Sequence, residues 1–163
     1  MPEGIAVVRG GHTTWLKWHR ARKTAGDLPF TAARILEGLR LGASVEVDLV
    51  RHAGGGFAVL HDFVLDRATT GTGRVADTPP EVLRTLFQRD GNGNPTAHHP
   101  MLFEDLCALI AAFHAAGKRI DAYTLTSADA AAVAIARRLL DLRADQITTD
   151  DPVGLEKALE TGA

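Results

Sequence analysis

Short apolar stretches of strand length alternate with longer stretches of helical periodicity, and this alternation constrains the fold of the 163 residues more than any other feature. We predict strands near Trp15, Val45, Phe57, Ile120 and Ile147. Helical patterns cover residues 31–42, 78–86, 101–116, 127–140 and a last segment from Pro152 onward. Strands that alternate with helices indicate an α/β protein with a mainly parallel sheet. Without repeats or linkers, residues 1–163 are predicted to form one domain, with part of residues 1–14 mobile.

The composition excludes several classes of protein. Apolar residues make up 45% of the chain and charged residues 23%, which is ordinary for a soluble domain. The net charge of -2 is unlike that of a nucleic-acid-binding protein. The single cysteine, Cys107, excludes an internal disulfide and a cysteine-based zinc site. No apolar run reaches the roughly 18 residues of a membrane span, and none resembles a signal peptide, so we expect a cytoplasmic protein.

The stretch Ser44–Val50 is predicted to be a strand that carries chemistry on one face. Glu46 and Asp48 share that face, with their backbones roughly 6 to 7 Å apart. Carboxylates at this spacing can converge on a hard divalent cation, Mg²⁺ or Ca²⁺. The alternative is an edge strand with one solvated, charged face. The surrounding sequence decides between the two.

Polar residues follow two other predicted strands, as His19-Arg20 and His61-Asp62. In parallel α/β folds the site lies at the carboxyl ends of the strands, so these groups are expected to meet near Glu46 and Asp48. An arginine can bind a phosphate in a two-pronged way. Two histidines can accept a proton from a nucleophile and give one to a leaving group. The set therefore suits phosphate-ester chemistry, with the acid and base roles of the histidines left open.

A series of motifs in order along the chain resembles the glycerophosphodiester phosphodiesterase family. His19-Arg20-Ala21 resembles the family's opening His-Arg-Gly, and Gly42 to Leu49 resembles its Gly-Ala-x-x-Glu-x-Asp-Val. Further matches are Phe57 to Asp62 with Leu65 to Gly73, Pro100 to Leu106, Tyr123 to Thr126, and Asp145 to Pro152. Each match alone is weak, but together they are specific for residues 15–110.

The resemblance implies a (β/α)₈ barrel, the TIM-barrel fold, that hydrolyses glycerophosphodiesters to glycerol 3-phosphate and an alcohol with a divalent cation. Such a protein would be a phosphoric diester hydrolase of glycerol and lipid metabolism. His19 and His61 match the family's acid/base pair, and Arg20 matches its phosphate-binding arginine. Glu46 and Asp48 match two of its metal ligands. The substrate would be a small molecule.

The chain departs from the family in length and in several residues. Ala21 replaces the family's glycine, and Thr126 replaces an asparagine. Leu28-Pro29-Phe30-Thr31 keeps the proline and threonine of the family's Pro-Glu-Asn-Thr but loses its acid. A complete barrel takes about 250 residues, so we predict a TIM-barrel-like fold with about five of the eight strands. The family's Ile-Glu-Ile-Lys strand, which supplies a third carboxylate ligand, has no match. Asp62 and Glu104 are candidates for that ligand, and exposed sheet edges would favour a homo-oligomer.

Two functions remain open at this point. The first is a metal-dependent phosphodiesterase, and the second is an inactive remnant that binds phosphate or a protein partner. A Rossmann-type nucleotide site is disfavoured because no Gly-x-Gly-x-x-Gly opens a helix after the first strand. Outside the site, four histidines are predicted to face solvent: His12, His52, His98 and His99. Four other side chains are predicted to pack inside the protein: Trp15, Trp18, Tyr123 and Cys107.

Overall fold

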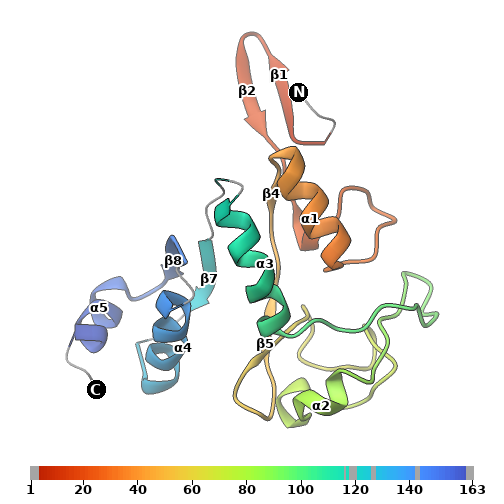
Figure 1. Ribbon diagram of the computed structural model, residues 1–163, viewed down its shortest axis with the longest axis vertical. Coiled ribbons are helices and arrows are strands. Elements are labelled where there is room, and N and C mark those ends of the chain that lie inside the picture. The colour runs from red at the N-terminus through yellow and green to blue at the C-terminus, as the bar shows by residue number, and fades with distance from the viewer. Residues whose placement is uncertain (1–3, 116, 118–120, 126–127, 142–143, 161–163) are drawn as a thin grey trace. The chain divides into compact units, whose positions relative to one another are not determined.

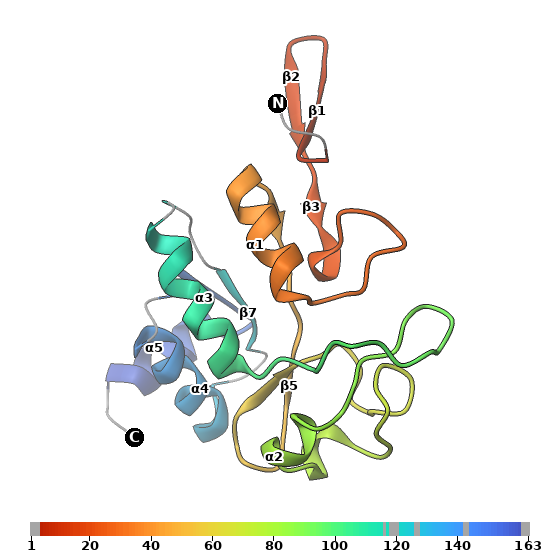
Figure 2. The same cartoon turned by 45° about the vertical axis from the view of Figure 1, so that its right-hand side comes forward.

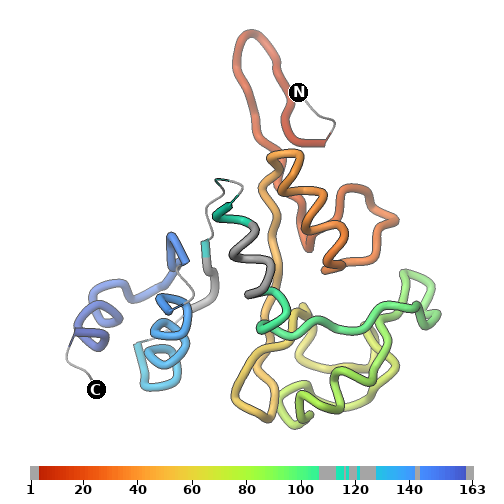
Figure 3. Tube along the Cα trace, in the orientation of Figure 1, coloured from red at the N-terminus to blue at the C-terminus, as the bar shows by residue number. Residues whose placement is uncertain are grey.

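The computed structural model describes residues 4–115, 117, 121–125, 128–141 and 144–160 (Figures 1 and 3). The chain divides into two compact units, residues 1–109 and 110–163. The prediction of one domain stays a prediction. No helix in the described ranges is long and apolar enough to cross a membrane.

The first unit begins with an antiparallel hairpin of β1 (Ala6–Arg9) and β2 (His12–Trp15) (Figure 2). Gly10 and Gly11, with φ angles of 58° and 79°, make its turn, because glycine adopts this left-handed backbone at little cost. The sequence analysis assigned no element here. Trp15 is 67% exposed, so its predicted packing is wrong: it lies in a two-stranded ribbon that the described chain leaves open to solvent. His12 is exposed, as predicted.

A β-α-β segment follows, in which β3 (Lys17–Trp18) and β4 (Ser44–Val45) are parallel and α1 (Ala32–Leu41) connects them. The side chain of Thr31 caps α1, and Gly42 ends it with a φ of 87°, which confirms the predicted helix. Trp18 is buried, also as predicted. A Cβ on Gly38 would lie 2.6 Å from Val45, so α1 rests very close to these strands.

The predicted strand Ser44–Val50 is wrong in its middle. β4 ends at Val45 and β5 (Leu49–Arg51) begins four residues later, with residues 46–48 in neither strand. The two strands have different partners, since β4 pairs with β3 whereas β5 pairs antiparallel with β6 (Phe57–Val59). The chain changes partner at residues 46–48, which we call the carboxylate junction.

The turn between β5 and β6 contains Gly54, Gly55 and Gly56, of which Gly55 has a φ of 79°. His52 lies inside this turn, where its Nδ1 accepts a hydrogen bond from the Gly54 N–H at 3.1 Å. Only 4% of His52 is exposed, so the prediction that it faces solvent is wrong. The tight turn folds its own histidine inward.

Short helices and loops complete the first unit, with η2 (Val75–Asp77) and α2 (Pro80–Leu83) after β6. The N-cap of α2 is Pro79 rather than the predicted Thr78, and the helix is one turn long. His98 and His99 are exposed in a loop, as predicted. The main apolar cluster lies between β5, β6 and these elements and is formed by Val50, Ala58, Leu60, Leu65, Val75, Leu83 and Leu102.

Helix α3 (Phe103–Ala115) leads into the second unit, where β7 (Asp121–Leu125) and β8 (Gln146–Thr149) form a parallel pair. The unit also holds α4 (Ala130–Asp141) and α5 (Pro152–Glu160). The Asp129 carboxylate caps α4 by accepting the Ala132 N–H at 2.9 Å. The predicted cap Ser127, and the side chains of Cys107 and Tyr123, lie outside what the structure describes.

Within the described ranges the strands form four pairs: β3–β4 and β7–β8 are parallel, and β1–β2 and β5–β6 are antiparallel. The predicted α/β class is confirmed, whereas the expected predominance of parallel pairing is not. Both antiparallel pairs are local hairpins, which short glycine-containing turns can close.

Candidate active site

The candidate site begins where β3 ends. The chain passes from Trp18 into a short 3₁₀ turn, η1 (His19–Ala21), in which Arg20 and Ala21 have positive φ angles of 54° and 55°. This conformation costs a non-glycine residue roughly 1 kcal/mol or more. Glycine adopts a positive φ at little cost, so a glycine, as in the family's motif, would fit the position of Ala21 with less strain. The turn points the backbone N–H of Arg20 at Glu46 Oε2, 3.0 Å away.

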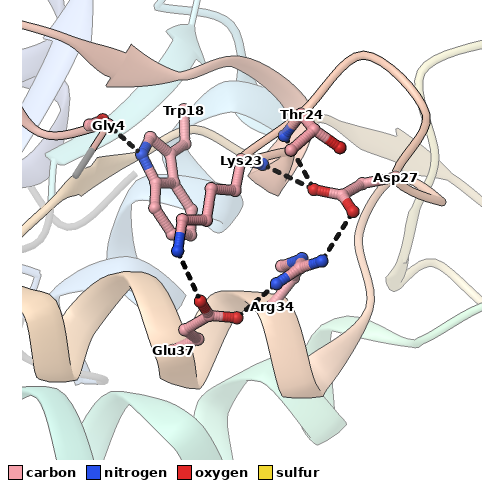
Figure 4. Close-up of polar contacts among 7 residues, drawn as sticks. All are labelled: Gly4, Trp18, Lys23, Thr24, Asp27, Arg34 and Glu37. Atoms are coloured by element: carbon pink, nitrogen blue, oxygen red, sulfur yellow. Dashed lines mark hydrogen bonds and ion pairs between the residues drawn. The ribbon is translucent and has the colours of Figure 1, made fainter.

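A network of charged side chains holds the loop that follows this turn (Figure 4). Asp27 accepts hydrogen bonds from the backbone N–H groups of Lys23 and Thr24 and from the Arg34 guanidinium. Glu37 binds both Arg34 and Lys23. Burial acts to raise the pKa of Asp27, but these hydrogen bonds bring it below its ordinary value. The network therefore ties the loop after His19-Arg20 to helix α1.

The carboxylate junction lies beside the turn. Glu46 Oε2 is 3.7 Å from His19 Nε2, and Asp48 Oδ2 is 3.9 Å from Arg20 Nε. The second distance is too long for a hydrogen bond. Arg20 Nε and Asp48 Oδ2 are both buried, and neither has a hydrogen-bond partner among the described residues.

Asp48 interacts electrostatically with the other predicted site residues. Burial raises the pKa of Asp48, and the nearby charge of Glu46 raises it further. The charges of His61, Arg20 and His19 act in the opposite direction. Asp48 thus lies within electrostatic reach of the four other residues that the sequence analysis selected. Their chemical roles stay predictions.

His61 follows β6 and begins a segment, residues 61–67, that we call the His61 loop. Its Nδ1 lies 2.8 Å from Asp62 Oδ1. Arg67 donates from Nε to Asp62 Oδ2 and from Nη2 to Oδ1, both at 3.0 Å. The hydrogen bond from His61, and then that from Arg67, hold the pKa of Asp62 below its ordinary value against the effect of burial. The sequence analysis gave Arg67 no role, although its position five residues after Asp62 was the available signal.

The residues fit a divalent cation only in part. Asp48 offers a buried carboxylate oxygen without a hydrogen bond, next to the second carboxylate of Glu46, and hard cations bind such oxygens. No three histidine, cysteine, aspartate or glutamate side chains among the described residues are placed to hold one metal ion.

Neither predicted third ligand completes the site. Both oxygens of Asp62 are engaged by His61 and Arg67. Glu104 lies beside Gly56, where its Oε1 would be 3.3 Å from an added Cβ. Gly56 precedes β6 and His61 follows it, so Glu104 is at the opposite end of that strand.

Solved structures of similar fold give an independent comparison. A glycerophosphodiester phosphodiesterase from Agrobacterium tumefaciens is 22% identical, with a TM-score of 0.61 over 89% of this chain and 61% of its own. A second Agrobacterium tumefaciens protein, assigned as a glycerophosphoryl diester phosphodiesterase, is 23% identical, with a TM-score of 0.63 over 82% and 53%. A phosphodiesterase from Oleispira antarctica, solved with the product sn-glycerol-3-phosphate, is 17% identical, with a TM-score of 0.62 over 89% and 60%.

These matches define first a class of fold: the chain is an α/β protein with part of a TIM-barrel-like fold. The barrel it resembles is that of glycerophosphodiester phosphodiesterases, which confirms the predicted resemblance at the level of the fold. The chain spans between 53% and 61% of the length of these structures. Neither family models nor curated protein sequences gave a match.

Proposed function

We propose that the chain hydrolyses glycerophosphodiesters to glycerol 3-phosphate and an alcohol. One observation carries the proposal. A buried guanidinium nitrogen of Arg20 and a buried carboxylate oxygen of Asp48 lack hydrogen-bond partners among the described residues, within electrostatic reach of two histidines. Unpaired buried polar atoms are costly, so they favour a ligand that supplies both an acceptor and a cation. A phosphodiester that arrives with a divalent cation is such a ligand.

Glu46 and Asp48 would hold the cation, Mg²⁺ or Ca²⁺. When bound, the cation would neutralise the phosphoryl oxygens and polarise the phosphorus. Arg20 would bind a phosphoryl oxygen through Nε, the donor that the described residues leave unpaired. The backbone N–H of Arg20 already engages Glu46, so the guanidinium is held beside the two carboxylates.

His19 and His61 would transfer the protons. The net reaction adds water across one P–O bond. The attacking oxygen loses its proton to one imidazole, and the departing alkoxide takes a proton from the other. Both rings are accessible to a substrate, since 60% of the His19 side chain and 43% of the His61 side chain are exposed. The Oleispira antarctica structure with sn-glycerol-3-phosphate supports a product of this class.

A second candidate function is phosphate or partner binding without catalysis. The observation that favours it is the two-carboxylate junction, because no third ligand lies close enough among the described residues. A cation held by two carboxylates alone is weakly bound unless water or substrate completes its coordination.

The test uses the purified protein with glycerophosphocholine and with a nitrophenyl phosphodiester. We expect turnover with Mg²⁺ or Ca²⁺, loss of turnover with a chelator, and little turnover in His19→Ala and His61→Ala. His12→Ala is the matched control, because His12 is an exposed histidine on β2. Wild-type turnover no higher than that of the His19 and His61 variants would leave binding as the function.

We also propose that copies of the chain associate through strand edges. Strands β3 and β4 form a sheet of two in the described chain, and unpaired edges favour association. Light scattering at several protein concentrations would show a mass that rises to a multiple of 17.4 kDa. A constant monomer mass would exclude this association.

A further inference from the structure

We infer that Asp62 and Arg67 are positioning residues, which hold His61 in the tautomer and orientation that proton transfer requires. The inference deepens the proposed function and rests on the role proposed there for His61. It is drawn from three contacts, which join the side chains of His61, Asp62 and Arg67 in one line: imidazole to carboxylate to guanidinium.

The first step concerns the imidazole. At 2.8 Å, His61 Nδ1 is at hydrogen-bond distance from Asp62 Oδ1. A carboxylate held next to a guanidinium accepts hydrogen bonds, so Nδ1 is the ring atom that carries the proton. Nε2 is then the nitrogen with a free lone pair, available to accept a proton from the reacting oxygen. When the ring becomes an imidazolium, the same carboxylate stabilises its charge.

The second step concerns the carboxylate. Arg67 contacts both oxygens of Asp62 with two different nitrogens, each at 3.0 Å. Two parallel contacts of this kind fix the plane of a carboxylate, whereas a single contact lets it rotate. Asp62 is also the less exposed member of the pair, with 17% of its side chain accessible against 77% for Arg67. The oxygen that faces His61 therefore keeps its direction.

The third step concerns the loop that carries the three residues. The backbone of Leu65 donates to Gly73, and the backbone of Val75 donates to Phe63. Leu65 and Val75 are buried in the main apolar cluster. The His61 loop is thus fixed to the core at Phe63 and Leu65, between Asp62 and Arg67, and positioning is best done from such a rigid support.

Stability is a poor explanation for the Arg67 contact. Most of the Arg67 side chain is exposed, and ion pairs of exposed side chains contribute at most about 1 kcal/mol. A change at Arg67 should therefore leave the fold intact, which makes it a clean variant for the test.

The first measurement reads the tautomer of His61 and needs no activity. Protein labelled with ¹⁵N-histidine is studied by NMR, and His61→Gln assigns the His61 signals. We expect the Nδ1–H form in wild type, a shift toward Nε2–H in Asp62→Ala, and a smaller shift in Arg67→Ala. Arg74→Ala is the matched control, since Arg74 is 70% exposed, lies just beyond the same loop and pairs with Asp77 at 3.9 Å.

The second measurement is kinetic. We expect kcat to fall by about 10- to 100-fold in Asp62→Ala and by about tenfold in Arg67→Ala, with KM changed by less than about twofold. Arg67→Lys should recover only part of the loss, because an ammonium cannot make the two-pronged contact. Arg74→Ala should have wild-type kcat.

The outcomes separate this inference from the proposed function. If the Nδ1–H form of His61 persists in Arg67→Ala and Asp62→Ala, the positioning role is wrong, whatever the activity. If the tautomer shifts as expected but wild type has no turnover, the positioning role stands and the proposed reaction fails. If Asp62→Ala does not fold, the tautomer in Arg67→Ala decides alone.

Discussion

Asp48 and Asp62 are aspartates of one candidate site, and their surroundings are opposite. Asp48, in the carboxylate junction, is half-buried near Glu46 and keeps one buried oxygen without a hydrogen bond from the described residues. Asp62, in the His61 loop, is engaged at both oxygens by side chains of its own loop. The pKa of Asp48 is raised by burial and by Glu46, whereas the hydrogen bond from His61 lowers that of Asp62.

The two aspartates differ in their hydrogen bonds. Side chains of the His61 loop contact both oxygens of Asp62, whereas one oxygen of Asp48 has no hydrogen-bond partner among the described residues. A carboxylate with all its hydrogen bonds made is a fixed support, which suits the orientation of a histidine. A carboxylate with a buried oxygen that lacks a hydrogen bond carries an unfavourable free energy, which a bound cation would relieve. Raised pKa values of this origin are concentrated at functional sites.

The largest expected effect is a loss of kcat when a histidine of the candidate site is replaced, either His19 beside the carboxylate junction or His61 in the His61 loop. We expect His61→Ala and His19→Ala each to lower kcat by about 10²- to 10⁴-fold, as for other general acid–base groups. The double variant should lose little more than the worse single variant, because the two rings act in one reaction. Steady-state kinetics on a nitrophenyl phosphodiester measures all three. Fully multiplicative losses would show that the two regions act independently.

The next effect tests the support of the carboxylate junction. Gly38→Ala would place a methyl group 2.6 Å from Val45 and 3.1 Å from Trp18, so α1 must move away from β3 and β4. Overpacking of this kind costs about 1 to 3 kcal/mol. Urea unfolding measures the loss, and Gly26→Ala is the control because a Cβ there meets nothing within 4 Å. Equal stability of the two variants would mean that α1 packs more loosely than described.

Neutralising Asp48 should stabilise the protein. Its pKa lies above the ordinary value of 3.8, so the ionised carboxylate opposes folding, increasingly as the pH rises from 3.8 through the raised pKa. At pH 7, without divalent cations, we expect Asp48→Asn to raise the free energy of unfolding by about 1 kcal/mol, or Tm by about 2 to 4 °C. The gain should disappear below pH 3.8. Denaturant unfolding with a chelator measures this gain in the free energy of unfolding. A destabilised variant would contradict the raised pKa of Asp48.

Neutralising Asp62 should have the opposite sign. Its pKa lies below 3.8, so its contribution to stability is complete above pH 3.8 and is lost as the pH falls through the lowered value. We expect Asp62→Asn to be less stable than wild type at pH 7 and equal to it in strong acid. The same unfolding series, at pH 3, 5 and 7, measures both variants. If both variants changed the free energy of unfolding in the same direction, the two aspartates would not have the opposite charge environments described above.

The smallest expected change in stability concerns the charged network that joins the loop before α1 to that helix. Arg34→Ala removes the contacts to Asp27 and Glu37, and partly exposed pairs of this kind contribute about 0.5 to 1 kcal/mol. Arg40→Ala is the control, an exposed arginine on the same helix. Thermal unfolding in low and high salt measures both, and the difference should shrink at high salt. A difference that salt leaves unchanged would argue that Arg34 acts by packing.

Most of the candidate site was predictable because each part is a local pattern. His19-Arg20, Glu46 and Asp48, and His61 are short motifs that follow β3, β4 and β6, and the end of a short apolar run can be recognised from the sequence. The contact of Arg67 with Asp62 was missed, because a spacing of five residues in a loop of undetermined shape does not say whether the two side chains meet. The third-ligand candidates failed for the same reason: sequence spacing does not say that Glu104 lies at the other end of β6.

The sequence by itself determined the α/β class and helix α1 with its Thr31 cap and Gly42 end, and it predicted the polar residues of the candidate site. Those features depend on periodicity and on caps, which act over a few residues. Only the tertiary structure decided that the strand breaks at residues 46–48, that His52 is buried, and that one buried oxygen of Asp48 lacks a hydrogen bond among the described residues. Strand partners, burial and the charge environment of Asp48 depend on residues distant in the chain, and no local pattern encodes them.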